Sequence, residues 1–130
     1  MSLNRDEIKE QYKWLTSGSK ECIVLEQKDY ESLMDDNSEL SIIEVKECDA
    51  TKIVETNQEI FQNAQRIVIS FITSQEYSFL NISMFVESIE ESLPKSIQES
   101  CELIFTSHPN ETMSDDECSV TLFVKYKKEV

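Results

Sequence analysis

The feature that most constrains the fold is the run RIVISFIT, residues 66–73, because it is apolar on both of its faces. In an extended strand, Ile67 and Phe71 point to one side of the sheet. Val68 and Ile72 point to the other side. A strand with two apolar faces has to be covered on both, which is typical of the centre of a sheet. The run therefore predicts a central strand.

Two helices are predicted on either side of this strand along the chain. Apolar residues recur at helical spacing from Ile82 to Leu93, and Pro94 ends that pattern because its ring cannot continue a helix. Residues 49–63 carry a second apolar stripe, and Asp49 is a suitable cap for its start. Both segments predict amphipathic helices that pack one face against the sheet.

Three further strands complete the predicted sheet. Residues 41–48 alternate between an apolar face and a mostly polar one, which predicts an edge strand. Charged Glu44, Lys46 and Glu47 discourage pairing of that edge with another copy, so we favour a monomer. CELIFTS and CSVTLFVKY near the C-terminus are interpreted as an antiparallel pair joined by a polar, acidic connection.

The N-terminal region is predicted to cover the second face of the sheet. Ile8, Tyr12 and Leu15 recur at helical spacing within residues 5–15 and make a short amphipathic helix. The following loop contains Gly18, which is expected to supply a left-handed backbone position. Beyond this loop, a short helix over 30–34 follows an acidic residue that is a suitable cap.

These elements predict an α+β fold built as a two-layer sandwich. A four-stranded mixed sheet carries helices on one face in the order β-α-β-α-β-β, and the N-terminal helix covers the other face. We divide the chain into an N-terminal helix and loop, residues 1–20, and a domain over 21–130, packed as a single unit.

Charge excludes several classes of partner. The formal net charge is −14, and the basic residues are scattered, so the chain has no basic stripe that would hold nucleic acid. The sequence has no run of about 18 apolar residues, the length that a membrane-spanning helix needs. The charged N-terminus also lacks the apolar stretch of a secretion signal. We therefore expect a cytoplasmic protein that binds neither nucleic acid nor membrane.

The reactive side chains predict no catalytic or metal site. Cys22, Cys48, Cys101 and Cys118 lack a paired spacing, so we expect reduced, partly buried thiols, and no metal or cofactor. His108, the single histidine, is expected to be an exposed turn residue. No Ser or Cys has a histidine predictably near it, so we expect no enzyme activity from this chain alone.

The succession of elements over roughly 22–126 resembles the C-terminal domain of the FtsZ/tubulin superfamily, most specifically over 64–93 together with the acidic connection and the last strand. The segment CIVLEQKDYESLM, residues 22–34, resembles that family's activating loop. After the central strand, where the family tends to show glycine, this chain has TSQEY. The family's nucleotide-binding half needs a glycine-rich turn, and this chain has one glycine in 130 residues. The chain therefore looks like the half of a polymerising GTPase that holds no nucleotide.

The resemblance also implies a partner-facing loop. In FtsZ-like proteins this loop carries an Asn and two Asp residues and enters the nucleotide pocket of the neighbouring subunit, where the acids help to position the attacking water. The corresponding positions here are Val24, Glu26 and Asp29. The Asn is lost, the first acid is longer by one methylene, and the second is kept. Alternatively, Asp29 caps the short helix and Glu26 is a solvated surface acid.

The resemblance thus implies a non-enzymatic interaction module that binds or caps an FtsZ-type filament, or a related cytosolic partner, in bacterial cell division. Two alternatives stay open. The chain is the C-terminal part of a larger FtsZ-like GTPase, or it supplies Glu26 and Asp29 in trans to a partner's GTPase site. In each case, repulsion between acidic proteins predicts binding that depends on salt or cations.

Overall fold

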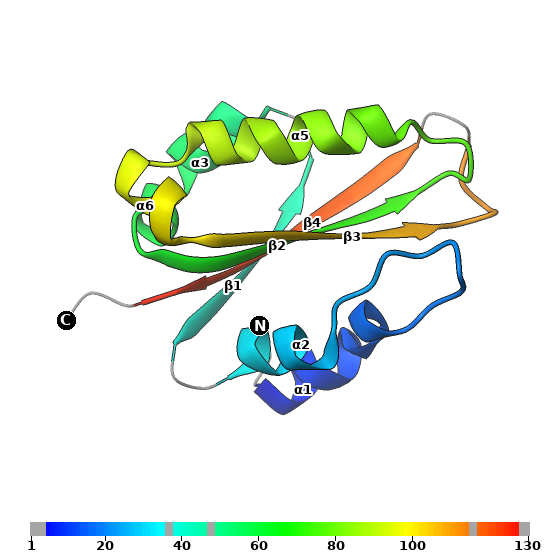
Figure 1. Ribbon diagram of the computed structural model, residues 1–130, viewed down its shortest axis with the longest axis horizontal. Helices are drawn as coiled ribbons and strands as arrows, with labels where there is room; N and C mark the ends of the chain where they lie inside the picture. Colours follow the sequence, from blue (N-terminus) through cyan, green and yellow to red (C-terminus); the bar gives the residue numbers. More distant parts are fainter. Residues whose placement is uncertain (1–4, 36–37, 47–48, 115–116, 128–130) are drawn as a thin grey trace.

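A computed structural model describes residues 5–35, 38–46, 49–114 and 117–127. Its sheet has four strands in the order β1-β4-β2-β3 (Figure 1). These strands span Glu39–Val45 (β1), Ala64–Thr73 (β2), Glu102–Pro109 (β3) and Cys118–Tyr126 (β4). β4 runs antiparallel to both β1 and β2, whereas β2 and β3 are parallel. The mixed four-stranded sheet and the α+β class are as predicted.

β2 lies at the centre of the sheet, which confirms the prediction from its two apolar faces. Ile67 and Phe71 belong to a core under one layer of helices, and Val68 belongs to a second core on the opposite face. β1 lies at an edge as expected. On its second face Glu44 is exposed as predicted, and so is Lys46 just beyond the strand, whereas Ile42 packs against the second core. Residues 47 and 48, included in the predicted strand, lie outside the described part of the chain.

The last two strands do not pair with each other, so the predicted antiparallel pair is wrong. β2 lies between them, with Ile69 opposite Phe105 of β3 on one side and Leu122 of β4 on the other. The connection from β3 to β4 passes the end of β2, where the Asn110 N–H donates to the Thr73 carbonyl at 2.7 Å. A ten-residue apolar strand offers two full edges for pairing, and the chain uses both.

Four helices cover the face of the sheet that appears uppermost in Figure 1. They are α3 (Ala50–Thr56), α4 (Gln58–Phe61), α5 (Phe79–Ser92) and α6 (Lys95–Ser100). Asp49 caps α3 as predicted, with its carboxylate accepting the Lys52 N–H at 3.2 Å. Asn57 divides the predicted 49–63 helix into α3 and α4. Pro94 ends α5, and α6 begins directly after it without having been predicted.

The opposite face is covered by α1 (Arg5–Gln11), the 3₁₀ helix η1 (Lys13–Thr16) and α2 (Gln27–Met34), which we call the N-terminal layer. Leu15 and Leu33 are fully buried there. Tyr12 meets Phe123 of β4 edge to face, with ring centroids 4.9 Å apart. The N-terminal helix therefore forms part of the packed protein, as its apolar stripe predicted, and the sheet is buried on both faces.

Gly18 is required by close packing rather than by its backbone angles. No described residue has a positive φ, so the predicted left-handed position is wrong. A Cβ atom built on Gly18 would lie 2.7 Å from the Cys22 sulfur, closer than side chains tolerate. The glycine thus allows the turn before the loop to fold against Cys22.

The burial of the thiols agrees with the sequence where the structure describes them. Cys22, Cys101 and Cys118 are partly buried, as predicted, and Cys48 lies outside the described residues. Among the described helices, none combines the length and apolar character needed to cross a bilayer. Nor does any group of three candidate ligands in the described ranges have an arrangement suited to a metal ion.

Candidate protein-interaction site

The loop that precedes α2 is fixed to the sheet by backbone hydrogen bonds. Ile23 pairs with Ser107 on the outer edge of β3, with N···O distances of 2.8 and 2.9 Å. Leu25 is buried, and its N–H donates to the Leu15 carbonyl at 2.8 Å. Although the backbone is held at Ile23 and Leu25, Ile23 and Val24 remain 40% and 38% exposed. The loop therefore presents two apolar side chains to solvent on a held backbone.

Glu26 lies at the surface where this loop meets α2. It occupies the N-cap position, but its side chain makes no capping hydrogen bond. The carboxylate is 71% exposed and lies 3.5 Å from the Lys28 ammonium. An ion pair with this much solvent around it contributes little to stability, so Glu26 is available to a partner.

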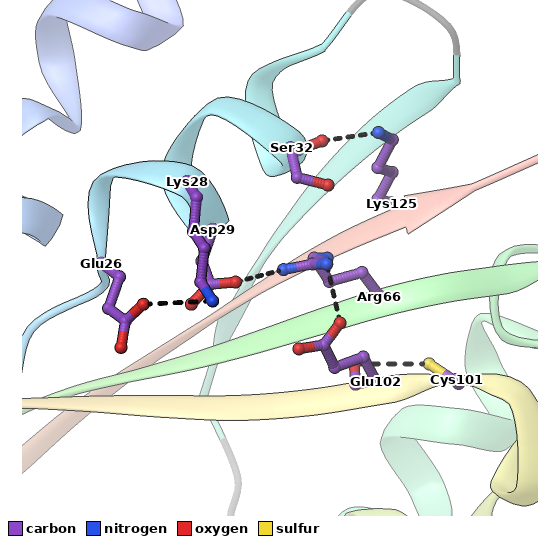
Figure 2. Close-up of polar contacts among 8 residues, drawn as sticks. All are labelled: Glu26, Lys28, Asp29, Ser32, Arg66, Cys101, Glu102 and Lys125. Carbon is purple, nitrogen blue, oxygen red and sulfur yellow. Dashed lines mark hydrogen bonds and ion pairs between the residues drawn. The ribbon is translucent and has the colours of Figure 1, made fainter.

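Asp29 is turned towards the sheet instead. Its carboxylate accepts a hydrogen bond from the Arg66 guanidinium at 3.0 Å, and its side chain is only 20% exposed (Figure 2). Arg66 also pairs with Glu102 at 2.7 Å, because the two residues lie opposite each other on β2 and β3. Asp29 does not cap α2 as predicted, since the helix begins two residues earlier, at Gln27.

The structure thus separates the three predicted site residues. Val24 and Glu26 lie exposed on the loop, and Asp29 is withdrawn into an ion pair beneath it. Arg66, the partner that holds Asp29, was missed from the sequence. The position of Arg66 in the sequence could have pointed to a partly buried ion pair. Arg66 is the sole basic residue between Lys52 and Lys95, and it stands at the start of the most apolar run.

Figure 2 shows two further contacts, of Lys125 with Ser32 and of the Cys101 thiol with the Glu102 carbonyl at 3.7 Å. The buried Lys125 ammonium donates to the Ser32 carbonyl near the end of α2 at 2.5 Å, which ties the helix to β4. Burial raises the pKa of the Cys101 thiol to about 11, with Arg66 lowering it and Glu102 raising it further. Cys101 is therefore protonated at neutral pH and is not a nucleophile.

His108 lies at the end of β3 rather than in an exposed turn, so that prediction is wrong. The N-terminal layer covers it, and the Trp14 ring stands against the imidazole with centroids 4.9 Å apart. Burial lowers the pKa of His108, while backbone groups of Ser17 and Trp14 act in the opposite direction. Burial against η1 therefore favours the neutral form of the ring.

This burial predicts a loss of stability in mild acid. Because the pKa of His108 is lowered in the folded state, the unfolded chain takes up the proton first, below its ordinary value of about 6.5. Stability is therefore complete above that pH and declines as pH falls through the folded-state pKa. Urea unfolding between about pH 7 and pH 5 should show a steeper decline for the wild type than for His108→Phe, which keeps a ring but cannot titrate. Parallel declines would contradict the prediction.

Comparison with known proteins gives a likeness of fold. No family model matches this sequence, and no curated protein matches it. Among solved structures, an empty FtsZ dimer from M. jannaschii aligns with a TM-score of 0.58 and 16% identity over 91% of this chain. A point mutant of FtsZ from M. jannaschii aligns with a TM-score of 0.56 and 14% identity over 93%. The chain spans 35% and 37% of those two structures. Its fold is that of the FtsZ C-terminal domain.

Proposed function

We propose that this chain, which has the FtsZ C-terminal fold, is a non-enzymatic module that binds or caps an FtsZ-type filament or a related cytosolic partner. The observation that carries the proposal is the loop before α2, which is anchored to β3 and η1 while Val24 and Glu26 face solvent. A held backbone loses little freedom on binding, so its exposed apolar and acidic groups are ready for a partner.

Capping is expected of a subunit that has one of the two longitudinal contact faces of a filament subunit and lacks the other. Longitudinal growth of a filament requires each subunit to offer two complementary faces. This chain offers a loop of the activating kind, and its single glycine leaves it without the glycine-rich turn that a nucleotide pocket needs. A subunit of this type would add to one end of a filament and stop further addition there.

Sedimentation of a cognate FtsZ with GTP tests the proposal. Stoichiometric amounts of this protein should lower the amount of FtsZ polymer that sediments at moderate salt. The effect should change with salt or divalent cations, because a chain of net charge −14 repels an acidic partner at long range. An unchanged pellet at every salt concentration would refute capping.

A matched pair of variants locates the contact. Val24→Asp places a charge in the exposed apolar part of the loop and should abolish the effect on the pellet. Ser96→Asp adds the same charge on α6, on the opposite face of the sheet, and should leave the effect intact. If both variants behave alike, the loop is not the contact.

A role in trans catalysis is disfavoured by the ion pair of Asp29. Supplying that carboxylate to a partner's GTPase site would require breaking its 3.0 Å contact with Arg66. Phosphate release by the partner should therefore be equal with the wild type and with the double variant Glu26→Gln, Asp29→Asn. A rise seen only with the wild type would favour the catalytic role.

A second candidate is that the chain is the C-terminal part of a larger FtsZ-like GTPase. The observation that favours it is the share of FtsZ that the chain spans, 35% in one structure and 37% in the other. Sequencing the reading frame upstream of this segment decides the matter. A continuous frame with a glycine-rich nucleotide-binding half would replace the capping proposal.

A further inference from the structure

A second surface, on the layer of helices opposite the loop, combines exposed apolar side chains with a groove. The described residues include five large apolar side chains that are well exposed, and three of them stand in the first two turns of α5: Phe79, Leu80 and Met84. Leu80 and Met84 are 66% and 56% exposed and lie four residues apart, so they share one side of the helix. A helix of a self-sufficient domain seldom leaves such a pair in water.

A groove of about 530 Å³ runs beside these residues, between α3 and α5. Its floor is apolar, with Phe71 and Val120 from the sheet, and Tyr77 and Phe85 add aromatic walls. Met84 forms part of the rim. Figure 1 shows α3 and α5 above the same face of the sheet, and a hydrogen bond of 3.4 Å between the Thr51 and Ser92 hydroxyls links the two helices. The volume lies in the usual range of ligand-binding clefts, about 300–1,000 Å³, so the groove has room for a bulky side chain.

The same side of α5 becomes acidic towards its C-terminal end. Glu87 and Glu91 follow Met84 at i+3 and i+7, so they continue the row that Leu80 and Met84 begin. Both glutamates are exposed, and α5 contains no basic residue. Asp49 adds an acidic group to the lining of the groove. The surface is therefore apolar at one end and negatively charged at the other.

We infer that this surface binds a cationic amphipathic segment of a partner protein. The segment lies along α5, places an apolar side chain in the groove beside Tyr77 and Phe85, and sets Lys or Arg against Glu87 and Glu91. Charge decides this occupant, because a second copy of a chain with a net charge of −14 would bring acid against acid. The surface is separate from the loop before α2, so it stands independently of the capping proposal.

Fluorescence anisotropy with three synthetic peptides tests this inference on the full chain. The first is a labelled helical peptide with leucine on one face and lysine on the other. The second has glutamate in place of lysine, and the third is a scrambled peptide of the first composition. The lysine peptide should bind at least about tenfold more tightly than either control, because only it matches both the groove and the acidic row. Equal binding of the scrambled peptide would overturn the inference.

Matched charge variants separate specific docking from general attraction. The double variant Glu87→Lys, Glu91→Lys should weaken binding of the lysine peptide by about tenfold or more. Glu31→Lys, Glu111→Lys makes the same change of charge at exposed sites outside α5 and outside the lining of the groove, and should weaken binding by less than about threefold. All four positions are exposed, so the variants should fold, and their thermal unfolding checks this. Equal weakening would assign the binding to net charge and overturn the inference.

The position of the peptide and the state of the free protein complete the test. Backbone amide shifts on adding the lysine peptide should concentrate at Tyr77, Asn81 and Ser88, which line the groove. Shifts confined to the N-terminal layer would overturn the inference. Sedimentation velocity without peptide should show a monomer. A dimer that Met84→Lys dissociates would identify a second copy as the occupant and reject the cationic partner.

Discussion

Replacing Phe123 by alanine is expected to lower the free energy of unfolding by about 3–5 kcal/mol, the usual cost of deleting a buried aromatic ring. Phe123 has no exposed surface and stands in β4, which pairs with both β1 and β2. Its ring packs against Tyr12 and belongs to the core beneath the N-terminal layer. The loss should appear in urea unfolding followed by circular dichroism. Trp14, the only tryptophan, reports on unfolding of the N-terminal layer by fluorescence. The midpoint of its fluorescence transition should move to lower urea together with the midpoint seen by circular dichroism.

A volume-conserving change provides the control. Phe123→Leu keeps most of the apolar bulk and should cost less than about 2 kcal/mol. If the alanine variant lost under about 1 kcal/mol, the N-terminal layer would not be packed on β4 as described. A fluorescence shift without a change in circular dichroism would mean that the layer unfolds separately from the sheet.

Replacing Asp29 by asparagine is expected to cost about 2 kcal/mol, because it leaves the Arg66 guanidinium, only 16% exposed, without its inner partner. The cost stays below that of a fully buried pair, since Glu102 still contacts the guanidinium at 2.7 Å. Denaturant unfolding of the single variant measures this loss. The N-terminal layer should become easier to release, because Asp29 joins α2 to the sheet.

A double-mutant cycle isolates the contact itself. Combining Asp29→Asn with Arg66→Gln should give a coupling energy of about 1–3 kcal/mol between the two residues. Lys28→Gln serves as the control, because its ion pair with Glu26 is largely exposed and should contribute under about 0.5 kcal/mol. Additive effects of Asp29 and Arg66 would show that the ion pair does not hold α2.

The sequence predicted those parts of the fold that depend on local pattern. The two apolar faces of residues 66–73 placed β2 at the centre, and the stripe of Ile8 and Leu15 predicted a helix over the second face. The position of β4 was missed, because alternation along a strand indicates which face is buried but not which neighbour lies beside it. The order of the strands in the sheet depended on β2, because both of its edges could pair with another strand.

The candidate site shows the same division. The sequence allowed Glu26 to be interpreted as a solvated surface acid, and the side chain is exposed. The ion pair of Asp29 could not be predicted in this way, because it joins residues 37 apart in the chain. Only the three-dimensional arrangement brings Arg66 under α2. His108 was misread for the same reason, since its neighbour Trp14 comes from the far end of the sequence. Contacts between distant segments leave no periodic signal.

The strand order has a consequence for synthesis on the ribosome. β4 is the last of the four described strands to be made, and it lies between β1 and β2, where Tyr126 pairs with Glu39 of β1. Until β4 leaves the exit tunnel, β1 has no neighbour and one edge of β2 is bare. The sheet is thus completed only after Cys118–Tyr126 has been translated. Its most apolar strand stays exposed to chaperones during that delay.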